Sequence, residues 1–437
     1  MSKLFRFLIF LLCLQGVLMS KSVERIDIDG VEIPVIFEEQ KILPIVSMQI
    51  VFVGGGSIND SNKSGLARLV SKMFNEGTLS EGSIKFAEIL DERAISLSVS
   101  SGGETLNFEL SSLKEEFAFG ANMLKNLLKE PNLSDKAFKK VRTQTLGTIS
   151  NKKSDFDFVA NTKLKELMFE NSPLGLNSLG TEESIKLLQL EDVKEFSDRY
   201  INLKNTIVVI GGDIDKESAK DIVKNILSSL SAGDEARLGF YNASTAQKEV
   251  IQTKDTEQAY IYFGAPLYIK VDDKDMHKLK VAGFILGEGG FGSRLMEEIR
   301  VKRGLAYSAY AKFSVGNSSS YMSGHLQTKN ENRVEAKKIV KEVIEEFVKN
   351  GVTNNELEQA KKFLLGSEPL RLETLSQRMS RSFSEFYKGL EIGYVKKELE
   401  LIEKLSLEEL NEFIASHKEI VELIFSIVTN EDNRPKR

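Results

Sequence analysis

The sequence is poor in the residues that build disulfide frameworks and histidine metal sites. Its 437 residues include one cysteine, no tryptophan, three histidines and seven prolines. The single cysteine, Cys13, excludes a disulfide within the chain. None of the histidines has a second histidine or a cysteine at ligand spacing, so a self-sufficient zinc site is not expected; they are His277, His325 and His417. The few prolines and the 41% of hydrophobic residues favour a globular, helix-rich chain.

A charge excess of one sign is also missing. The 59 basic and 64 acidic residues give a net charge of −5 and are spread along the whole chain. No basic stripe indicates a nucleic-acid partner, and no polybasic segment indicates an anionic lipid surface. A chain of this length suits two domains, or a duplicated pair of about 200 residues each.

The beginning of the chain has the layout of a secretory signal peptide at residues 1–20. Lys3 and Arg6 precede an apolar run at 7–14, and the small residue Ser20 ends the segment. The apolar run is short for a membrane span, so cleavage and export are favoured over an uncleaved anchor. We therefore expect a periplasmic or secreted protein with no stable membrane span after cleavage, and the cleavage point stays open.

The rest of the chain repeats one order of elements. We expect a first half at 21–230, a linker rich in Ala, Gly, Ser and Asp at 231–248, and a second half at 249–437. Both halves end in an amphipathic helix, an apolar strand and a polar turn, which favours duplication over a chance similarity. Hydrophobic periodicity predicts strands or strand pairs at 31–37, 44–53, 94–110, 206–210, 258–263, 307–315, 319–327 and 424–427, and helices at 64–74, 114–129, 135–149, 156–169, 190–200, 274–286, 293–300, 334–349 and 407–413.

Four segments carry the motifs of one enzyme family. They are Gly65-Leu-Ala-Arg-Leu-Val-Ser-Lys-Met-Phe-Asn-Glu-Gly-Thr78, residues 172–185, residues 207–213 and, most specific, Gly289-Gly-Phe-Gly-Ser-Arg-Leu-Met-Glu-Glu-Ile-Arg-Val-Lys-Arg-Gly-Leu-Ala-Tyr307. Together they resemble the pitrilysin/insulinase metallopeptidases over nearly all of the chain after residue 20. The resemblance implies an α+β fold of two homologous halves, each a mostly antiparallel sheet with helices packed on one face.

The residues that bind zinc in active members of that family are replaced in this chain. The two His of an inverted His-x-x-Glu-His motif on one helix bind Zn²⁺ there, the Glu acts as general base, and a carboxylate on a later helix completes the zinc site. The resemblance places these four positions at Arg68, Ser71, Lys72 and Thr148. A charged ammonium and a guanidinium offer no lone pair to a metal. We therefore expect a first half without metal, in which the helix is kept only as architecture.

The second half keeps the family's substrate contacts. In heterodimeric members, one subunit holds zinc and the other supplies an Arg and a Tyr, which Arg300 and Tyr307 match. Both side chains are donors suited to a peptide carbonyl that gains negative charge. A bend where backbone can approach an extended peptide precedes them, at Gly287, Gly289, Gly290 and Gly292. If the matched segment is disregarded, the simpler interpretation is that Arg300 is a cation on a surface helix and that the ring of Tyr307 packs in a strand. The bend lacks the Lys-Ser/Thr of a phosphate-binding loop.

The resemblance implies a catalytically incomplete subunit that binds and positions peptide for a zinc-bearing homologous partner in a heterodimer. Zinc is expected in the partner, and no cofactor is expected in this chain. In the family, an extended peptide adds as a strand to a sheet edge, and the 94–110 hairpin of this chain resembles that edge. Without the metal beside it, the role of the hairpin in binding peptide is in doubt. Two alternatives stay open: a non-catalytic scaffold protein derived from the peptidase fold, and a homodimeric peptide-binding chaperone.

Overall fold

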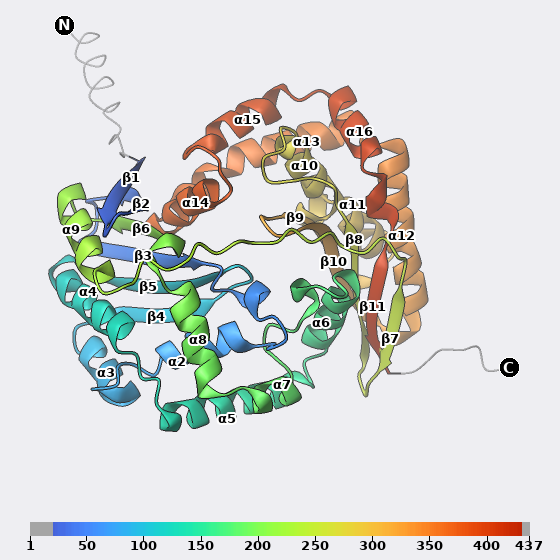
Figure 1. Cartoon of the computed structure of the whole chain (residues 1–437). Coiled ribbons are helices and arrows are strands. Elements are labelled where there is room, and N and C mark those ends of the chain that lie inside the picture. Colours follow the sequence, from blue (N-terminus) through green and yellow to red (C-terminus); the bar gives the residue numbers. More distant parts are fainter. Residues whose placement is uncertain (1–20, 431–437) are drawn as a thin grey trace, which may run out of the picture.

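Two β-sheets, one in each half of the chain, organise the fold (Figure 1). The computed structural model describes residues 21–430, so the predicted signal peptide at 1–20 lies outside the described residues. Within this range, no helix has both the length and the apolar character needed to cross a membrane. Residues 231–248 run between the two sheets without helix or strand.

The first sheet has six strands in the order β1-β2-β6-β3-β5-β4. Only the β2–β6 pair is parallel. Strand β6 is buried along its whole length because it lies between β2 and β3 and is covered on both faces. The strands are β1 Lys21–Ile28, β2 Val31–Glu39, β3 Ile45–Val53, β4 Ser96–Ser101, β5 Thr105–Leu113 and β6 Thr206–Gly212.

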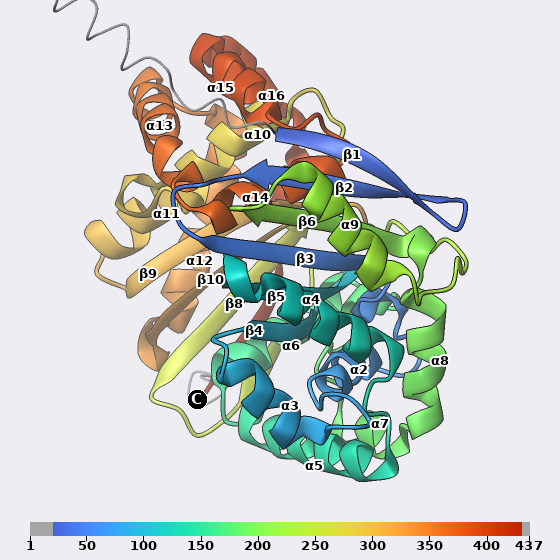
Figure 2. The same cartoon turned by 90° about the vertical axis from the view of Figure 1, so that its left-hand side faces the viewer.

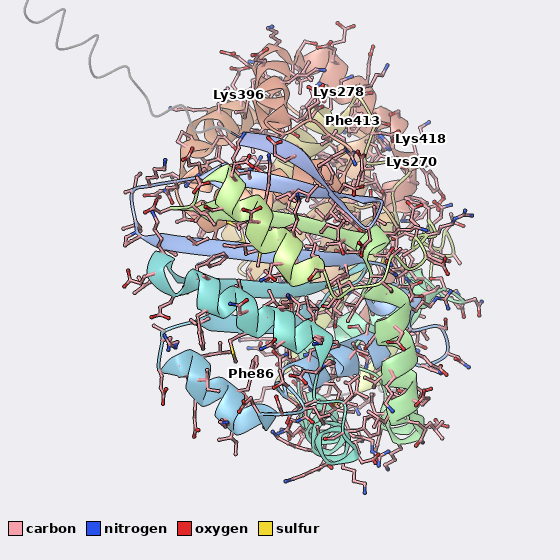
Figure 3. The ribbon with its side chains drawn as sticks, turned by 60° about the vertical axis from the view of Figure 1, so that its left-hand side comes forward. Phe86, Lys270, Lys278, Lys396, Phe413 and Lys418 are labelled. Carbon is pink, nitrogen blue, oxygen red and sulfur yellow. The ribbon has the colours of Figure 1, made fainter. Side chains whose placement is uncertain are left out.

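Helices of the first half cover one face of this sheet, as Figure 2 shows for α4 and α9. They contribute apolar side chains to one core with the inward-facing residues of the strands. Phe86, labelled in Figure 3, is the buried anchor of α3 in that core. The helices of this half are α2 Leu66–Phe74, α3 Gly82–Asp91, α4 Lys114–Lys129, α5 Asp135–Lys152, α6 Phe156–Met168, α7 Glu182–Leu187, α8 Leu190–Tyr200 and α9 Lys216–Leu227.

The second sheet has five strands in the order β7-β11-β8-β10-β9, and only the β11–β7 pair is parallel. Its strands are β7 Glu249–Thr253, β8 Gln258–Pro266, β9 Ala306–Val315, β10 Ser320–Lys329 and β11 Ile424–Thr429. Helices α10 and α12 pack on one face of this sheet, and α13 and α16 pack on these helices and contribute side chains to the same core. The helical segments are α10 Met276–Gly283, η4 Phe284–Glu288, α11 Arg294–Met296, η6 Glu297–Val301, α12 Arg333–Asn350, α13 Asn354–Ser367, α14 Leu375–Tyr387, α15 Tyr394–Lys404 and α16 Leu407–Ser416.

Each half sends one helix to the other half's sheet. Helix α6 of the first half packs on β8 and β11, where Met168 lies against Gly264. Helix α14 of the second half packs on β2 and β6, with Met379 buried against Ile36. These helices cover the faces that the halves' own helices leave open, so the two sheets are joined by reciprocal packing.

The expected fold class is confirmed, with two mostly antiparallel sheets and helices of the same half on one face of each. The exchange of α6 and α14 adds a cover to the second face that the sequence did not predict. Helix α3 was missed because only Phe86 and Leu90 of its residues are buried. The helices expected at 274–286 and 293–300 continue into the π-helical turns η4 and η6.

Candidate functional site

The N-terminus of α2 is held by a buried carboxylate. Asp60 is 1% exposed, and its two oxygens accept hydrogen bonds from the backbone N–H groups of Gly65 at 2.8 Å and Ala67 at 2.8 Å. Gly65 has φ +91, and a Cβ at this position would lie 2.8 Å from the Cα of Gly180. The motif segments 65–78 and 172–185 therefore meet at the start of α2 because both contribute a glycine to the contact.

A lysine occupies the place of the second histidine of the family's zinc motif. Lys72 is half-buried between α2 and α5, and its Nζ donates to Oγ1 of the buried Thr145 at 3.2 Å. Burial, and secondarily the charge of Arg68, lowers the pKa of Lys72. Ser71 donates to the Arg68 carbonyl at 2.9 Å, and Thr148 donates to a carbonyl one turn earlier on α5.

These four positions do not form a zinc site. They present a guanidinium, an ammonium and two hydroxyls that are already bonded to backbone carbonyls, in place of imidazole and carboxylate ligands. Within residues 21–430, no three His, Cys, Asp or Glu side chains converge as metal ligands. The residues present therefore do not fit the metal of the active enzymes, and no chemical step of this chain is derived through zinc.

The outer edge of the first sheet is occupied by a side chain. Strand β4 is an edge strand, and Asn75, which directly follows α2, bonds to the backbone of Val99 in its middle. The Asn75 amide donates to the Val99 carbonyl at 2.7 Å and accepts from the Val99 N–H at 3.0 Å. One side-chain amide thus forms the hydrogen-bond pair that an added peptide strand would form. The 94–110 hairpin is present, but its edge is blocked at this residue.

The two predicted contact residues of the second half lie in direct contact. The guanidinium carbon of Arg300 is 4.1 Å from the ring centroid of Tyr307 and 4.4 Å from that of Phe291. Arg300 is therefore held between two rings, each worth about 0.5–1 kcal/mol at an exposed site. Tyr307 is 81% exposed and Phe291 65%. The ring faces hold the cation, while the Arg300 N–H groups and the Tyr307 hydroxyl stay available to a ligand.

Phe291 was not among the predicted site residues. It lies inside the matched segment, and the signal that marks it is a large apolar side chain among glycines. Only its contact with Arg300 in the folded chain reveals its role.

A bulge in the second sheet turns Tyr307 outward. The β10–β9 register pairs Leu326 with Ala309 and Thr328 with Ala306, so Tyr307 and Ser308 together oppose one residue of β10. Ala306 and Ala309 are buried on the core side, whereas Tyr307 and Ser308 are both exposed. Without the extra residue, strict alternation would give these two side chains opposite faces. The bulge therefore places Tyr307 beside Arg300 at the sheet edge.

The four glycines of the bend have different surroundings. A Cβ on Gly287 would lie 2.4 Å from the backbone nitrogen of Ala311, and a Cβ on Gly289 would lie 2.7 Å from a carbonyl oxygen, so both positions serve close packing. Gly290 has φ +58, and no atom would contact a Cβ on Gly290 or Gly292. Only the latter two lie where a ligand has room.

An ion pair between Arg294 and Glu356 stabilises the glycine-rich bend. Arg294 donates to Glu356 through Nε at 2.6 Å and through an Nη at 2.9 Å, and also to the carbonyl of Gly351 at 2.7 Å. Burial raises the pKa of Glu356, but hydrogen bonds from Arg294 and Thr353 outweigh it and lower the pKa to about 2. This bidentate pair joins α11 to α13 and keeps the segment that carries Phe291 and Arg300 in place.

A cavity of about 580 Å³ lies between the two halves. Arg68 and Lys165 line it, together with the tip of the β4–β5 hairpin and Tyr387 of α14. The carboxylate of Glu104, at that tip, accepts from the Tyr387 hydroxyl at 2.7 Å and from the N–H of Ser318 at 2.9 Å. The hairpin of the first half is thereby fastened to the second half. Arg300 and Tyr307 do not line this cavity, so the structure keeps the two predicted groups of site residues apart.

Comparison with known proteins places these features in a family. Residues 36–182 match the profile described as Insulinase (Peptidase family M16), and residues 188–364 match Peptidase M16 inactive domain. The chain is 43% identical over 404 residues to the Helicobacter pylori protein named Non-peptidase homolog YmxG, covering 92% of this chain and 93% of the relative. It is 24% identical to Uncharacterized zinc protease YmxG of Bacillus subtilis, over 76% of this chain and 80% of the relative.

Solved structures have the same fold. The peptidase M16 inactive domain from Pseudomonas fluorescens superposes with a TM-score of 0.86 at 22% identity, covering 94% of this chain and 98% of that chain. A protease from Helicobacter pylori gives a TM-score of 0.82 at 16% identity, over 94% and 100% of the two chains. With both profiles matched in order and a relative of 43% identity over nearly the whole length, this chain belongs to peptidase family M16, the insulinase family.

Proposed function

We propose that this chain is the substrate-holding subunit of an exported heterodimeric peptidase whose zinc is carried by a homologous partner. The observation that carries the proposal is the Arg300 guanidinium held between the rings of Phe291 and Tyr307, with both rings largely exposed. This preorganised donor pair fills no core, because both rings are largely exposed, and that favours a task in ligand binding over one in packing.

The first half also favours a partner that carries the zinc, because it lacks the metal ligands and its own peptide-binding edge is occupied. Lys72 and Arg68 replace the metal ligands, and the Asn75 amide occupies the β4 edge where a peptide would add beside them. Peptide would therefore be bound by the partner's edge strand and reached across the interface by Arg300 and Tyr307. In that arrangement Arg300 and Tyr307 stabilise the oxygen of the scissile carbonyl as it gains negative charge, and zinc held by the partner would supply the activation of water.

The test is cleavage by the reconstituted pair. The chain would be purified from its own cells with any M16 protein that carries the intact His-x-x-Glu-His motif, and peptide cleavage would be measured for the mixture and for each chain. We expect chelator-sensitive cleavage by the mixture only. Arg300→Ala and Tyr307→Phe should each lower kcat of the mixture by about 10²-fold or more while substrate binding is partly kept, as for the removal of one oxyanion donor.

Two neighbouring side chains provide matched controls. Arg303 lies in the same segment but is paired with Glu298 on the surface, and Tyr268 is an exposed tyrosine of the same half. Arg303→Ala and Tyr268→Phe should leave kcat unchanged. Chelator-sensitive cleavage by this chain alone would refute the proposal, and cleavage by the mixture that tolerates Arg300→Ala would assign the chain a scaffold role instead.

A further inference from the structure

Two cations that have no counter-ion among the residues that the structure describes line the cavity between the halves. Arg68 projects from α2 and Lys165 from α6, and both line the space of about 580 Å³. Within residues 21–430, neither side chain forms an ion pair or a hydrogen bond with another residue. This size is typical of a site for a small organic ligand or a short peptide segment.

The one carboxylate in the cavity wall is already engaged. Glu104 accepts from the Tyr387 hydroxyl and from the N–H of Ser318, so each of its two oxygens already has a donor. The wall near the cations also carries neutral donors, the side chains of Asn161 and Thr162 on α6. The lining is therefore positive and rich in hydrogen-bond donors.

Each of the two cations has a second cation beside it. Lys72 stands one turn after Arg68 on α2, and its charge interacts unfavourably with that of Arg68. Lys165 faces Lys312 of β9, and desolvation by the surrounding protein, with the charge of Lys312, lowers the pKa of Lys165. Like charges gathered without a counter-ion cost stability, which an anionic ligand would recover. The clustered positive charges therefore destabilise the folded chain unless an anionic group binds in the cavity.

We propose that the former zinc position has become part of a carboxylate-binding subsite, in which Arg68 and Lys165 take an anionic group of a peptide. The planar guanidinium suits bidentate contact with a carboxylate, and the ammonium supplies a second positive donor from another helix. Both cations belong to the first half, whose zinc ligands are replaced, so the subsite gives that half a binding task of its own. The inference rests on the proposed function in one respect, since it names an acidic or free C-terminal class for the peptide that the chain holds.

The experiment is a binding titration of the full chain, without a partner, with three fluorescent peptides of equal length. One is neutral and amidated, the second differs only in a free C-terminal carboxylate, and the third is amidated with internal glutamates. We expect the second or third peptide to bind about tenfold or more tightly than the neutral one, and the preference to weaken as salt is raised. The preferred peptide distinguishes a terminal from a side-chain carboxylate.

Variants assign the preference to the cavity. Arg68→Gln and Lys165→Gln should each remove most of the discrimination between anionic and neutral peptides. Lys396→Gln is the matched control, because Lys396 is an exposed lysine of α15 on the outer surface of the second half, away from the cavity (Figure 3). Thermal unfolding of each variant shows whether it remains folded.

Three results would overturn the inference: equal affinity for the three peptides, discrimination that survives both cavity variants, or an equal loss with Lys396→Gln. Absence of binding to all three peptides overturns it as well. None of these results touches the proposed function, which is judged by cleavage of a neutral, amidated substrate by the reconstituted pair and by its dependence on Arg300. The two proposals can therefore fail separately.

Discussion

Replacement of Asp60 by Asn tests how the first half holds the start of α2. Asp60 is fully enclosed, and its carboxylate accepts from the N–H groups of Gly65 and Ala67. Burial raises the pKa of this carboxyl group from its ordinary value of 3.8 to about 7, although the hydrogen bonds from Ala67 and Gly65 oppose the rise. In the folded chain, the Asp60 carboxyl group therefore loses its proton near pH 7.

The sign of the pH effect follows from that rise. Between about pH 4 and pH 7 the folded chain keeps a proton that the unfolded chain has released, so the free energy of unfolding falls as pH rises. A difference of about three between the two pKa values corresponds to about 4 kcal/mol, which is lost by about pH 8. Asn cannot ionise, but its NH₂ group would face one backbone N–H, at a cost of about 1–3 kcal/mol.

Urea unfolding from pH 5 to pH 8 measures the difference. Asp60→Asn should be less stable than the wild-type chain at pH 5, and the deficit should shrink or reverse by pH 8. Asp215→Asn is the control, because Asp215 caps α9 at the surface and hydrogen bonds from Ser218 lower its pKa. Its effect should be constant over this range. A constant difference between Asp60→Asn and wild type from pH 5 to pH 8 would refute the reasoning.

Three further substitutions have defined outcomes. Asn75→Ala should free the middle of the β4 edge, so hydrogen–deuterium exchange of the Val99 amide should accelerate, and unchanged exchange would contradict the hydrogen-bond pair. Phe291→Ala should weaken peptide binding by the reconstituted pair about two- to fivefold, the worth of one exposed ring on a cation, whereas Phe291→Tyr should preserve it. Glu356→Gln should lower the free energy of unfolding at pH 7 by about 2–3 kcal/mol, because the folded-state pKa of about 2 gives stability that is present above pH 4.5 and lost as pH falls toward 2. The difference between variant and wild type should therefore shrink in acid, and a difference that stays constant from pH 7 to pH 2 would contradict the reasoning.

The elements that the sequence predicted are those with a strong local signal. Helix α4 has the predicted bounds of 114–129, and strand β3 differs by one residue from the predicted 44–53, because their apolar spacing follows one period throughout. Helices α13, α14 and α15 were not predicted. In α14 the apolar residues face the sheet of the other half, a surface that no local pattern identifies. Strands β1 and β7 lie at the edges of their sheets and were not separately predicted.

For the candidate site, too, some features could be predicted from the sequence and others could not. Loss of the zinc ligands at Arg68, Lys72 and Thr148, and of the general base at Ser71, follows from residue chemistry, so the sequence alone determines it. The match that marks Arg300 and Tyr307 is also contained in one continuous segment.

Only the tertiary structure decided what surrounds these residues. The contact of Tyr307 with Arg300 requires the β9 bulge, the Asn75 amide meets Val99 across 24 positions of sequence, and the cavity is lined by α2 and α6. Contacts between distant segments depend on how the sheets pack, and the hydrophobic periodicity of one segment does not specify that packing. The sequence therefore determined which chemistry this chain has lost and which donors it has kept. The fold determined that Arg300 is held between two rings and that two cations, without a partner in the described part of the chain, line one cavity.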